Sequence, residues 1–160
     1  MADPDSTSLH LNQYLPYQLA NLAKRVSDAC NAEYGTTLGV SIAEWRVLAH
    51  LGQYAELHSR GLGEITFMDK SRVSRALKLL ESKAYMTRRP DPADKRASFL
   101  SLTESGQALY DKIVPLALDW EARFLSALDT SEYSDLRRVI SKLESQLNQM
   151  ENIPTLSPRG

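Results

Sequence analysis

Apolar residues recur at helical spacing near both ends of the 160-residue chain. Between Leu11 and Glu33 they form one stripe, made of Leu15, Leu19, Leu22, Val26 and Ala29. Towards the other end, apolar residues recur every three or four positions, a spacing typical of helices that pack against one another. These residues are Tyr133, Leu136, Ile140, Leu143 and Leu147. This pattern predicts an amphipathic helix at each end of the chain.

The segment between these helices is predicted to hold shorter helices with polar caps. Ser41 suits the N-cap of a helix that runs to about Gln53, and Asp69 suits the N-cap of a helix that covers positions up to 83. A short helix at 59–65 and a tight turn, "TFM", are expected just before Asp69. Two helices joined by a tight turn fit a helix-turn-helix.

A β-hairpin is predicted after Tyr85. The short runs "MTRR" and "ASFLSL" have strand character and flank a Pro- and Asp-rich turn, "PDPADK". Thr103 then suits the N-cap of a long helix from Glu104 to about Leu128, and a break at 129–131 separates it from a last helix that ends near Met150. The predicted fold class is therefore mainly α with a small β-hairpin.

Composition narrows the class of protein. A hydrophobic content of 42% and a charged content of 24% are ordinary for a globular protein, and we expect a cytoplasmic chain without membrane contact. There is no Gly-rich phosphate loop and no nucleophile elbow, and the three histidines are scattered. Since Cys30 is the single cysteine, a disulfide framework and a cysteine-rich zinc site are excluded. We expect no catalytic residue, metal or cofactor.

The net charge of −1 is unevenly distributed. The window from Met68 to Arg96 holds nine Lys or Arg and four Asp or Glu, whereas the remainder holds ten and sixteen. A solvated helix flank is the simplest explanation of such a window. The alternative is a surface that binds a polyanion.

The helix after Asp69 divides into two faces. Val73, Ala76, Leu77 and Leu80 share an apolar face that must point into a core. The outer face is almost free of acids and carries the candidate DNA-binding residues of this helix, Lys70, Ser71, Arg72, Ser74, Arg75 and Lys78. A helix built only for solubility would mix both signs of charge on that face.

Duplex DNA is the polyanion that this pattern favours. Arg can form paired hydrogen bonds with guanine, Ser can bond base edges or phosphates, and Lys attracts phosphates. The hairpin that follows carries Arg88, Arg89, Lys95 and Arg96, and its basic tip could enter the adjacent minor groove.

The stretch "DKSRVSRALKLLESKAYMTRRPDPADKRASFLSLTESG", with "IAEWRVLAHL" upstream, resembles the MarR family of bacterial winged-helix transcriptional regulators. The resemblance covers about Leu11 to Met150. It implies a homodimer that binds a pseudo-palindromic operator, with helices at 11–35 and 104–150 pairing the subunits, a winged helix-turn-helix at 36–103, and flexible tails at 1–8 and 153–160. Residues 70–72, 74 and 75 correspond to recognition-helix contacts, Arg96 to the residue that enters the minor groove, and Asp94 to the residue that holds the wing.

Two departures from the family pattern stand out. The first helix of the motif reads "GLGE", and its glycines, Gly61 and Gly63, each cost about 1 kcal/mol of helix propensity. That helix is therefore expected to be short or mobile. Ala84 stands where the family often has the Gly that ends the recognition helix, so a left-handed cap would be mildly strained or the helix would end differently.

The sequence leaves open which signal would control such a regulator. An effector site would be formed by Tyr14, Tyr17, Arg46 and His50, with Arg46 binding a carboxylate or phosphate, although each is also explained as an interface or surface residue. The favoured function is a repressor released by a small molecule, such as an aromatic acid or its acyl thioester. The alternatives are a thiol-based redox repressor that uses Cys30, or a winged helix that binds only protein.

Overall fold

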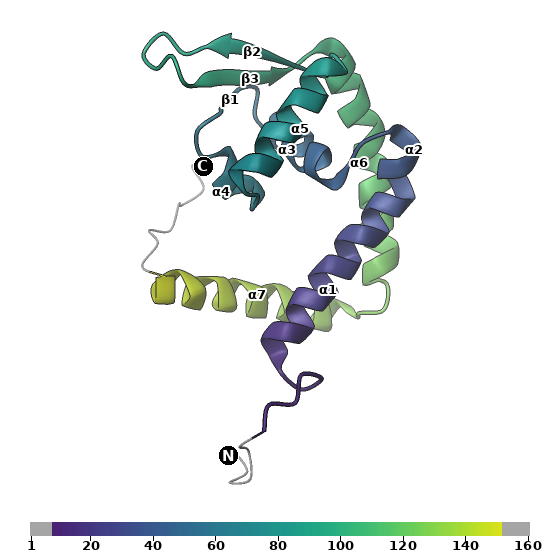
Figure 1. Cartoon of the computed structure of the whole chain (residues 1–160). Coiled ribbons are helices and arrows are strands. Elements are labelled where there is room, and N and C mark those ends of the chain that lie inside the picture. Colours follow the sequence, from purple (N-terminus) through teal and green to yellow (C-terminus); the bar gives the residue numbers. More distant parts are fainter. Residues whose placement is uncertain (1–7, 152–160) are drawn as a thin grey trace. The chain divides into compact units, whose positions relative to one another are not determined.

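The computed structural model describes residues 8–151. Its elements are α1 (Leu15–Cys30), the π-helical turn η1 (Asn31–Gly35), α2 (Thr36–Leu38), α3 (Ile42–Gln53), β1 (Leu57–His58), α4 (Leu62–Thr66), α5 (Lys70–Ser82), β2 (Met86–Pro90), β3 (Ser98–Leu102), α6 (Glu104–Leu125) and α7 (Thr130–Glu151) (Figure 1). The predicted fold class, mainly α with a small β-hairpin, is confirmed. Apart from Ser8, the tails expected to be flexible, 1–8 and 153–160, lie outside the described residues.

The described residues form two compact units, 8–118 and 119–151. The core of the first unit is built from apolar residues of α3, α5, β3 and α6. Its most completely buried side chains are Val47, Leu48, Leu62, Leu80, Leu100 and Ile113. Figure 1 shows the sheet at one end of this unit, with α3 and α5 packed against the strands. The core therefore fixes α5 relative to the hairpin.

The three predicted helix caps are present. Ser41 Oγ accepts the backbone N–H of Glu44, and the Glu44 carboxylate accepts the N–H of Ser41, which together form a capping box. Asp69 accepts the N–H of Arg72 at 2.9 Å, and Thr103 Oγ1 accepts the N–H of Gly106 at 3.1 Å. Because each cap satisfies an N–H that the helix itself leaves free, these side chains set where α3, α5 and α6 begin.

Glu44 also connects α3 to the end of α5. Its carboxylate is buried and pairs with Lys83 at 2.6 Å. Burial alone would raise the pKa of Glu44, but the hydrogen bonds from Lys83 and Ser41 outweigh it and hold the pKa below its usual value. The charged pair therefore helps to fix the orientation of α5 on α3.

Two helix boundaries predicted in the part of the chain before α5 are wrong. The first helix begins at Leu15, with Pro16 in its first turn, and widens into a π-helical turn after Cys30. Proline suits a first turn because its missing N–H would have no helical partner there, and this explains the later start. The helix expected at 59–65 is the shorter α4, which begins after Gly61 in a left-handed conformation (φ 78°).

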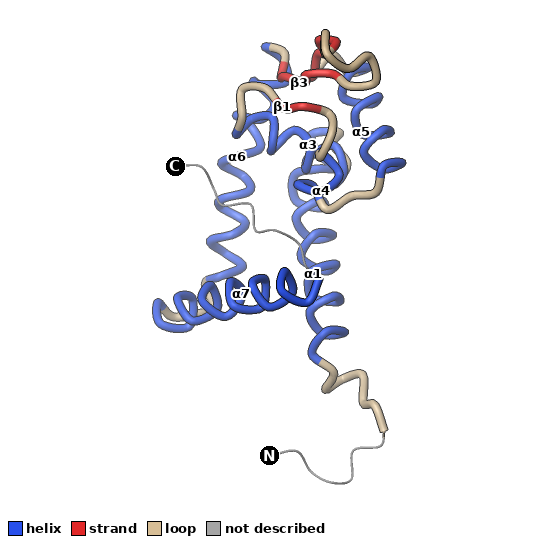
Figure 2. The backbone as a smooth tube through the Cα atoms, turned by 90° about the vertical axis from the view of Figure 1, so that its left-hand side faces the viewer, coloured by secondary structure: helices blue, strands red, loops and turns tan. Residues whose placement is uncertain are grey.

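The predicted hairpin is confirmed as β2 and β3, but the sequence did not reveal a third strand. β1 lies beside β3 (Figure 2) and pairs antiparallel with it, with Leu57 opposite Leu100. The strand order is β1-β3-β2. A strand of two residues is too short to show an alternating pattern. Ser59, expected in a helix, instead exchanges hydrogen bonds with Ser98: its N–H donates to the Ser98 carbonyl, and its Oγ accepts the Ser98 N–H.

The end of α5 has the strained left-handed cap that the sequence left as one of two possibilities. Ala84 has φ 57°, and its N–H and that of Tyr85 donate to the carbonyls of Glu81 and Leu80. These are the two hydrogen bonds of a Schellman motif, in which glycine is the usual left-handed residue. Phe67, in the turn before α5, is also left-handed (φ 53°), with its ring exposed.

The second unit consists of the end of α6 and the whole of α7. A break is present but lies at residues 126–129 and not at the predicted 129–131, since α7 begins at Thr130. Asp129 and Glu132 cap α7 reciprocally with two hydrogen bonds of 2.8 Å. The preceding helix ends at Leu125, short of the predicted Leu128. No residue of α7 is buried, so its apolar seam lies on the surface of this chain. The seam consists of Tyr133, Leu136, Ile140, Leu143 and Leu147.

Candidate nucleic-acid interface

α5 separates into the two faces that its sequence predicts. Its buried residues are the four predicted, Val73, Ala76, Leu77 and Leu80. The six candidate residues of the outer face are all exposed: Lys70, Ser71, Arg72, Ser74, Arg75 and Lys78. In the part of the chain that the structure describes, none of the four cations among them has an ion-pair partner. Their charge is therefore available to an external anion.

The cations on strand β2 of the hairpin differ from those of α5. Arg88 pairs with Glu81 at 3.0 Å, and Arg89 pairs with Glu56 at 2.8 Å while its guanidinium lies 4.5 Å from the centre of the Phe99 ring. Both side chains are engaged within the chain. They join the hairpin to α5 and to the segment before β1, respectively.

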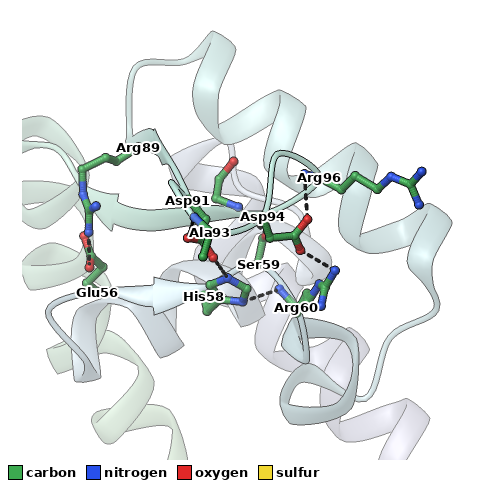
Figure 3. A network of polar contacts seen from close by, with 10 residues as sticks. Glu56, His58, Ser59, Arg60, Arg89, Asp91, Ala93, Asp94 and Arg96 are labelled. Carbon is green, nitrogen blue, oxygen red and sulfur yellow. Dashed lines mark hydrogen bonds and ion pairs between the residues drawn. The ribbon is translucent and has the colours of Figure 1, made fainter.

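The tip of the hairpin has a different arrangement. Asp94 accepts the backbone N–H of Arg96 at 3.0 Å and forms an ion pair with Arg60 (Figure 3). The Arg96 side chain extends away from this network in Figure 3. Lys95 and Arg96 are exposed, and neither has an ion pair within residues 8–151. The tip thus exposes two cations on a loop that the contacts of Asp94 stabilise.

A groove of about 400 Å³ lies between the hairpin and α5. The hairpin lines it with Arg88 and Arg96, and α5 lines it with Lys70 and Ser74. Arg60, from the segment before α4, also lines this groove. Four cations therefore surround a space that one acid, Glu64, also reaches. Such a concentration of positive charge between a helix and a hairpin favours a polyanion that contacts both.

Sequence reasoning missed the residues that connect β1 to the hairpin. His58 Nε2 lies 3.1 Å from Asp91 Oδ2, and Arg60 pairs with Asp94. Hydrogen bonds from the Ala93 N–H and from His58 hold the pKa of Asp91 below its usual value. Glu56, His58 and Arg60 occupy alternate positions, but a run this short gave no usable strand signal.

The four candidate effector residues are not brought together. Arg46 lines two cavities between α1 and α3, of about 190 Å³ and 350 Å³. Tyr14 and Tyr17 are exposed near the start of α1, and neither they nor His50 line these cavities. The His50 ring is occupied by a hydrogen bond of 2.7 Å to the Arg46 carbonyl. Of the four candidate effector residues, Arg46 is therefore the one that lines these cavities.

Cys30 lines the smaller cavity beside Tyr34. Burial raises the pKa of the Cys30 thiol, and it is the main reason that the pKa of Tyr34 rises to about 12. Peroxide-sensing cysteines need a stabilised thiolate, which calls for the opposite shift. The surroundings of Cys30 therefore favour a packing role.

Comparisons with known proteins agree with this architecture. Residues 38–97 match a model of the MarR family. The chain is 26% identical over 140 residues to the multiple antibiotic resistance protein MarR of Escherichia coli, covering 86% of this chain and 97% of that protein. A MarR/EmrR family transcriptional regulator from Acinetobacter sp. ADP1 superimposes with a TM-score of 0.78 at 27% identity, covering 88% of this chain and 99% of that one. A mutant of E. coli MarR complexed with operator DNA gives 0.74 at 25% identity, covering 85% and 99%.

A helix-turn-helix followed by a β-hairpin defines this protein as a winged-helix protein. The family-model match over residues 38–97 and the relatives above support a transcriptional regulator of the MarR family. Members of that family are regulators and not enzymes. Within residues 8–151 no helix is long and apolar enough to cross a membrane, and no cluster of three side chains suited to a metal ion is found.

Proposed function

We propose that the protein is a repressor that binds a pseudo-palindromic operator through α5 and the β2–β3 wing. The observation that carries this proposal is the contrast in charge pairing. Cations on strand β2 of the wing have acidic partners, whereas those on the outer face of α5 and at the wing tip have none within the described residues. α5 would read the major groove, and Lys95 and Arg96 would reach the adjacent minor groove.

The proposal includes a homodimer. α1 has no buried residue, and its Leu15, Leu19 and Leu22 are about half exposed, as is the seam of α7. Exposed apolar surface of this extent on two helices favours burial against a second copy. A two-fold dimer would place the two α5 helices about 34 Å apart, one turn of the duplex.

The DNA-binding proposal is tested with duplexes selected by the protein from a random-sequence pool. We expect a short inverted repeat to be enriched and the logarithm of its binding constant to fall linearly with the logarithm of salt concentration, by about 0.9 per phosphate contacted. Affinity would be measured by fluorescence anisotropy at several salt concentrations. If the protein bound neither selected nor random DNA at low salt, the result would favour the alternative, a winged helix that binds only protein.

Control is proposed to act at the two cavities that share Arg46. The smaller one is lined by the aromatic rings of Tyr34 and Trp45, and the larger one by the cations of Lys24, Arg46 and Arg72. An aromatic acid or its acyl thioester would match these two linings. Its aromatic ring would pack against the rings of the smaller cavity, and its anionic group would bind the cations of the larger one. Lys24 is already paired with Asp28, which leaves Arg46 and Arg72 as the anchors.

Two contacts would couple such an anion to DNA release. Arg72 also belongs to the outer face of α5, so an anion that binds it competes with DNA phosphates. Arg46 donates a hydrogen bond of 3.2 Å to the carbonyl of Thr66, at the end of α4, and an anion would compete for this donor as well. The expected coupling between effector and operator is about 1–3 kcal/mol.

The effector proposal predicts that Arg46→Ala needs a higher ligand concentration for release from the operator. Aromatic acids and their thioesters would be titrated against the protein–DNA complex of the wild type, of Arg46→Ala, and of Tyr17→Phe as the matched control. The control loses a hydroxyl that lines neither cavity, and we expect it to respond as the wild type does.

Release of wild type and Arg46→Ala at the same concentration would show that Arg46 is not the anchor. Release by oxidants of the wild type but not of Cys30→Ser would instead establish the redox alternative.

A further inference from the structure

The wing is attached to the segment around β1 by three side-chain pairs and one backbone pair. Residues 56, 58 and 60 alternate along this segment and pair with successive wing residues, Arg89, Asp91 and Asp94 (Figure 3). Ser59 adds the hydrogen bonds with Ser98. Since β1 itself has only two residues, these side chains carry much of the attachment.

The pair nearest the wing tip joins Arg60 to Asp94. One carboxylate oxygen of Asp94 accepts the N–H of Arg96, and the other pairs with the Arg60 guanidinium. Asp94 is mostly buried, with 23% of its side chain exposed, whereas 69% of the Arg60 side chain is exposed. Arg60 therefore reaches from the solvent side to the residue that shapes the loop carrying Arg96.

Two consequences follow for the wing tip. Without Arg60, the buried carboxylate of Asp94 loses its cation, and the loop loses its outermost connection to the segment before α4. The uncompensated charge would then also lie two residues from Arg96, next to the path of a DNA phosphate. Both effects act on the wing and leave the outer face of α5 unchanged.

We propose that Arg60 is a positioning residue for the minor-groove contact. It acts through Asp94, and it sets where Arg96 enters the groove. This inference rests on the proposed DNA-binding function. It assigns no direct contact between Arg60 and DNA, although Arg60 lines the groove between wing and α5. A direct phosphate contact is the competing explanation, and it predicts a different result in the experiment below.

The experiment follows methylation by dimethyl sulfate of a duplex selected by the wild-type protein. This reagent reports guanine N7 in the major groove and adenine N3 in the minor groove. Arg60→Ala is expected to lose adenine protection at the flanks of the site, to keep guanine protection at its half-sites, and to bind about tenfold more weakly. Arg60→Lys, which can still pair with Asp94, is expected to restore part of the adenine protection.

Asp94→Asn separates positioning from direct contact. Asparagine keeps an oxygen for the Arg96 N–H but cannot form the ion pair. Adding Arg60→Ala to Asp94→Asn is therefore expected to cause no further loss of affinity or protection. Glu56→Gln is the matched control, since it removes an ion pair to strand β2 and not to the tip loop, and it should leave adenine protection intact.

The outcomes are distinct. If the effects of Arg60→Ala and Asp94→Asn add, Arg60 contacts DNA directly and the proposal is wrong. Equal loss of protection in both grooves, or no loss at all, also overturns it. Thermal unfolding of each variant excludes a general loss of structure. If the wild type protects no base, the proposed function itself fails, and this result is separate from the others.

Discussion

The Arg75→Ala variant is expected to lose about 1–3 kcal/mol of operator affinity per half-site and to tolerate a different base at one position. Arg75 is exposed on the outer face of α5, and it has no ion pair within the described residues. Its neighbours on the helix, Val73 and Ala76, are buried, so the backbone beneath Arg75 is held by the core. An arginine whose backbone is held in this way can form paired hydrogen bonds with guanine.

The measurement compares operator and random DNA for the wild type, Arg75→Ala and Arg75→Lys. Lysine keeps the charge but cannot form the paired bond, so Arg75→Lys should bind random DNA as the wild type does and still lose specificity. Selection from a random pool would show which base position is relaxed. Equal losses on operator and random DNA for Arg75→Ala would assign Arg75 to the phosphate backbone instead of a base.

The Leu143→Glu variant is expected to be a monomer and to bind the operator about 100- to 10,000-fold more weakly. Leu143 lies in the middle of the seam of α7, and its side chain is exposed in this chain. In the proposed dimer that seam is buried, and a carboxylate placed there would have no partner. A monomer holds one half-site only and loses the gain from binding two sites at once.

Sedimentation and operator titration would be carried out on the same samples. Ser145→Glu is the matched control because it adds the same charge on the opposite side of α7, away from the seam. We expect it to remain dimeric and to bind as the wild type does. A wild-type protein that sediments as a monomer at micromolar concentration would contradict the dimer, and a dimeric Leu143→Glu would move the interface elsewhere.

Elements with local signals could be predicted from the amino-acid sequence. The apolar spacing of α5 identified its four buried residues, and Ser41, Asp69 and Thr103 identified three helix starts. These predictions succeed because helical periodicity and N-caps depend on residues at most four positions apart. The basic outer face follows from the same periodicity, so the sequence was sufficient to place the candidate recognition helix. The strained cap at Ala84 was one of two outcomes that the missing family glycine left open.

Which charges are free and which are engaged depends on contacts between distant parts of the chain. Arg88, Arg89 and Arg96 look alike in the sequence, yet the first two pair with acids and the third does not within the described residues. Arg89 and Glu56 are 33 positions apart, as are His58 and Asp91. No local spacing rule connects such residues. They meet because the sheet brings β1 beside the wing, and only this tertiary pairing reveals Arg60.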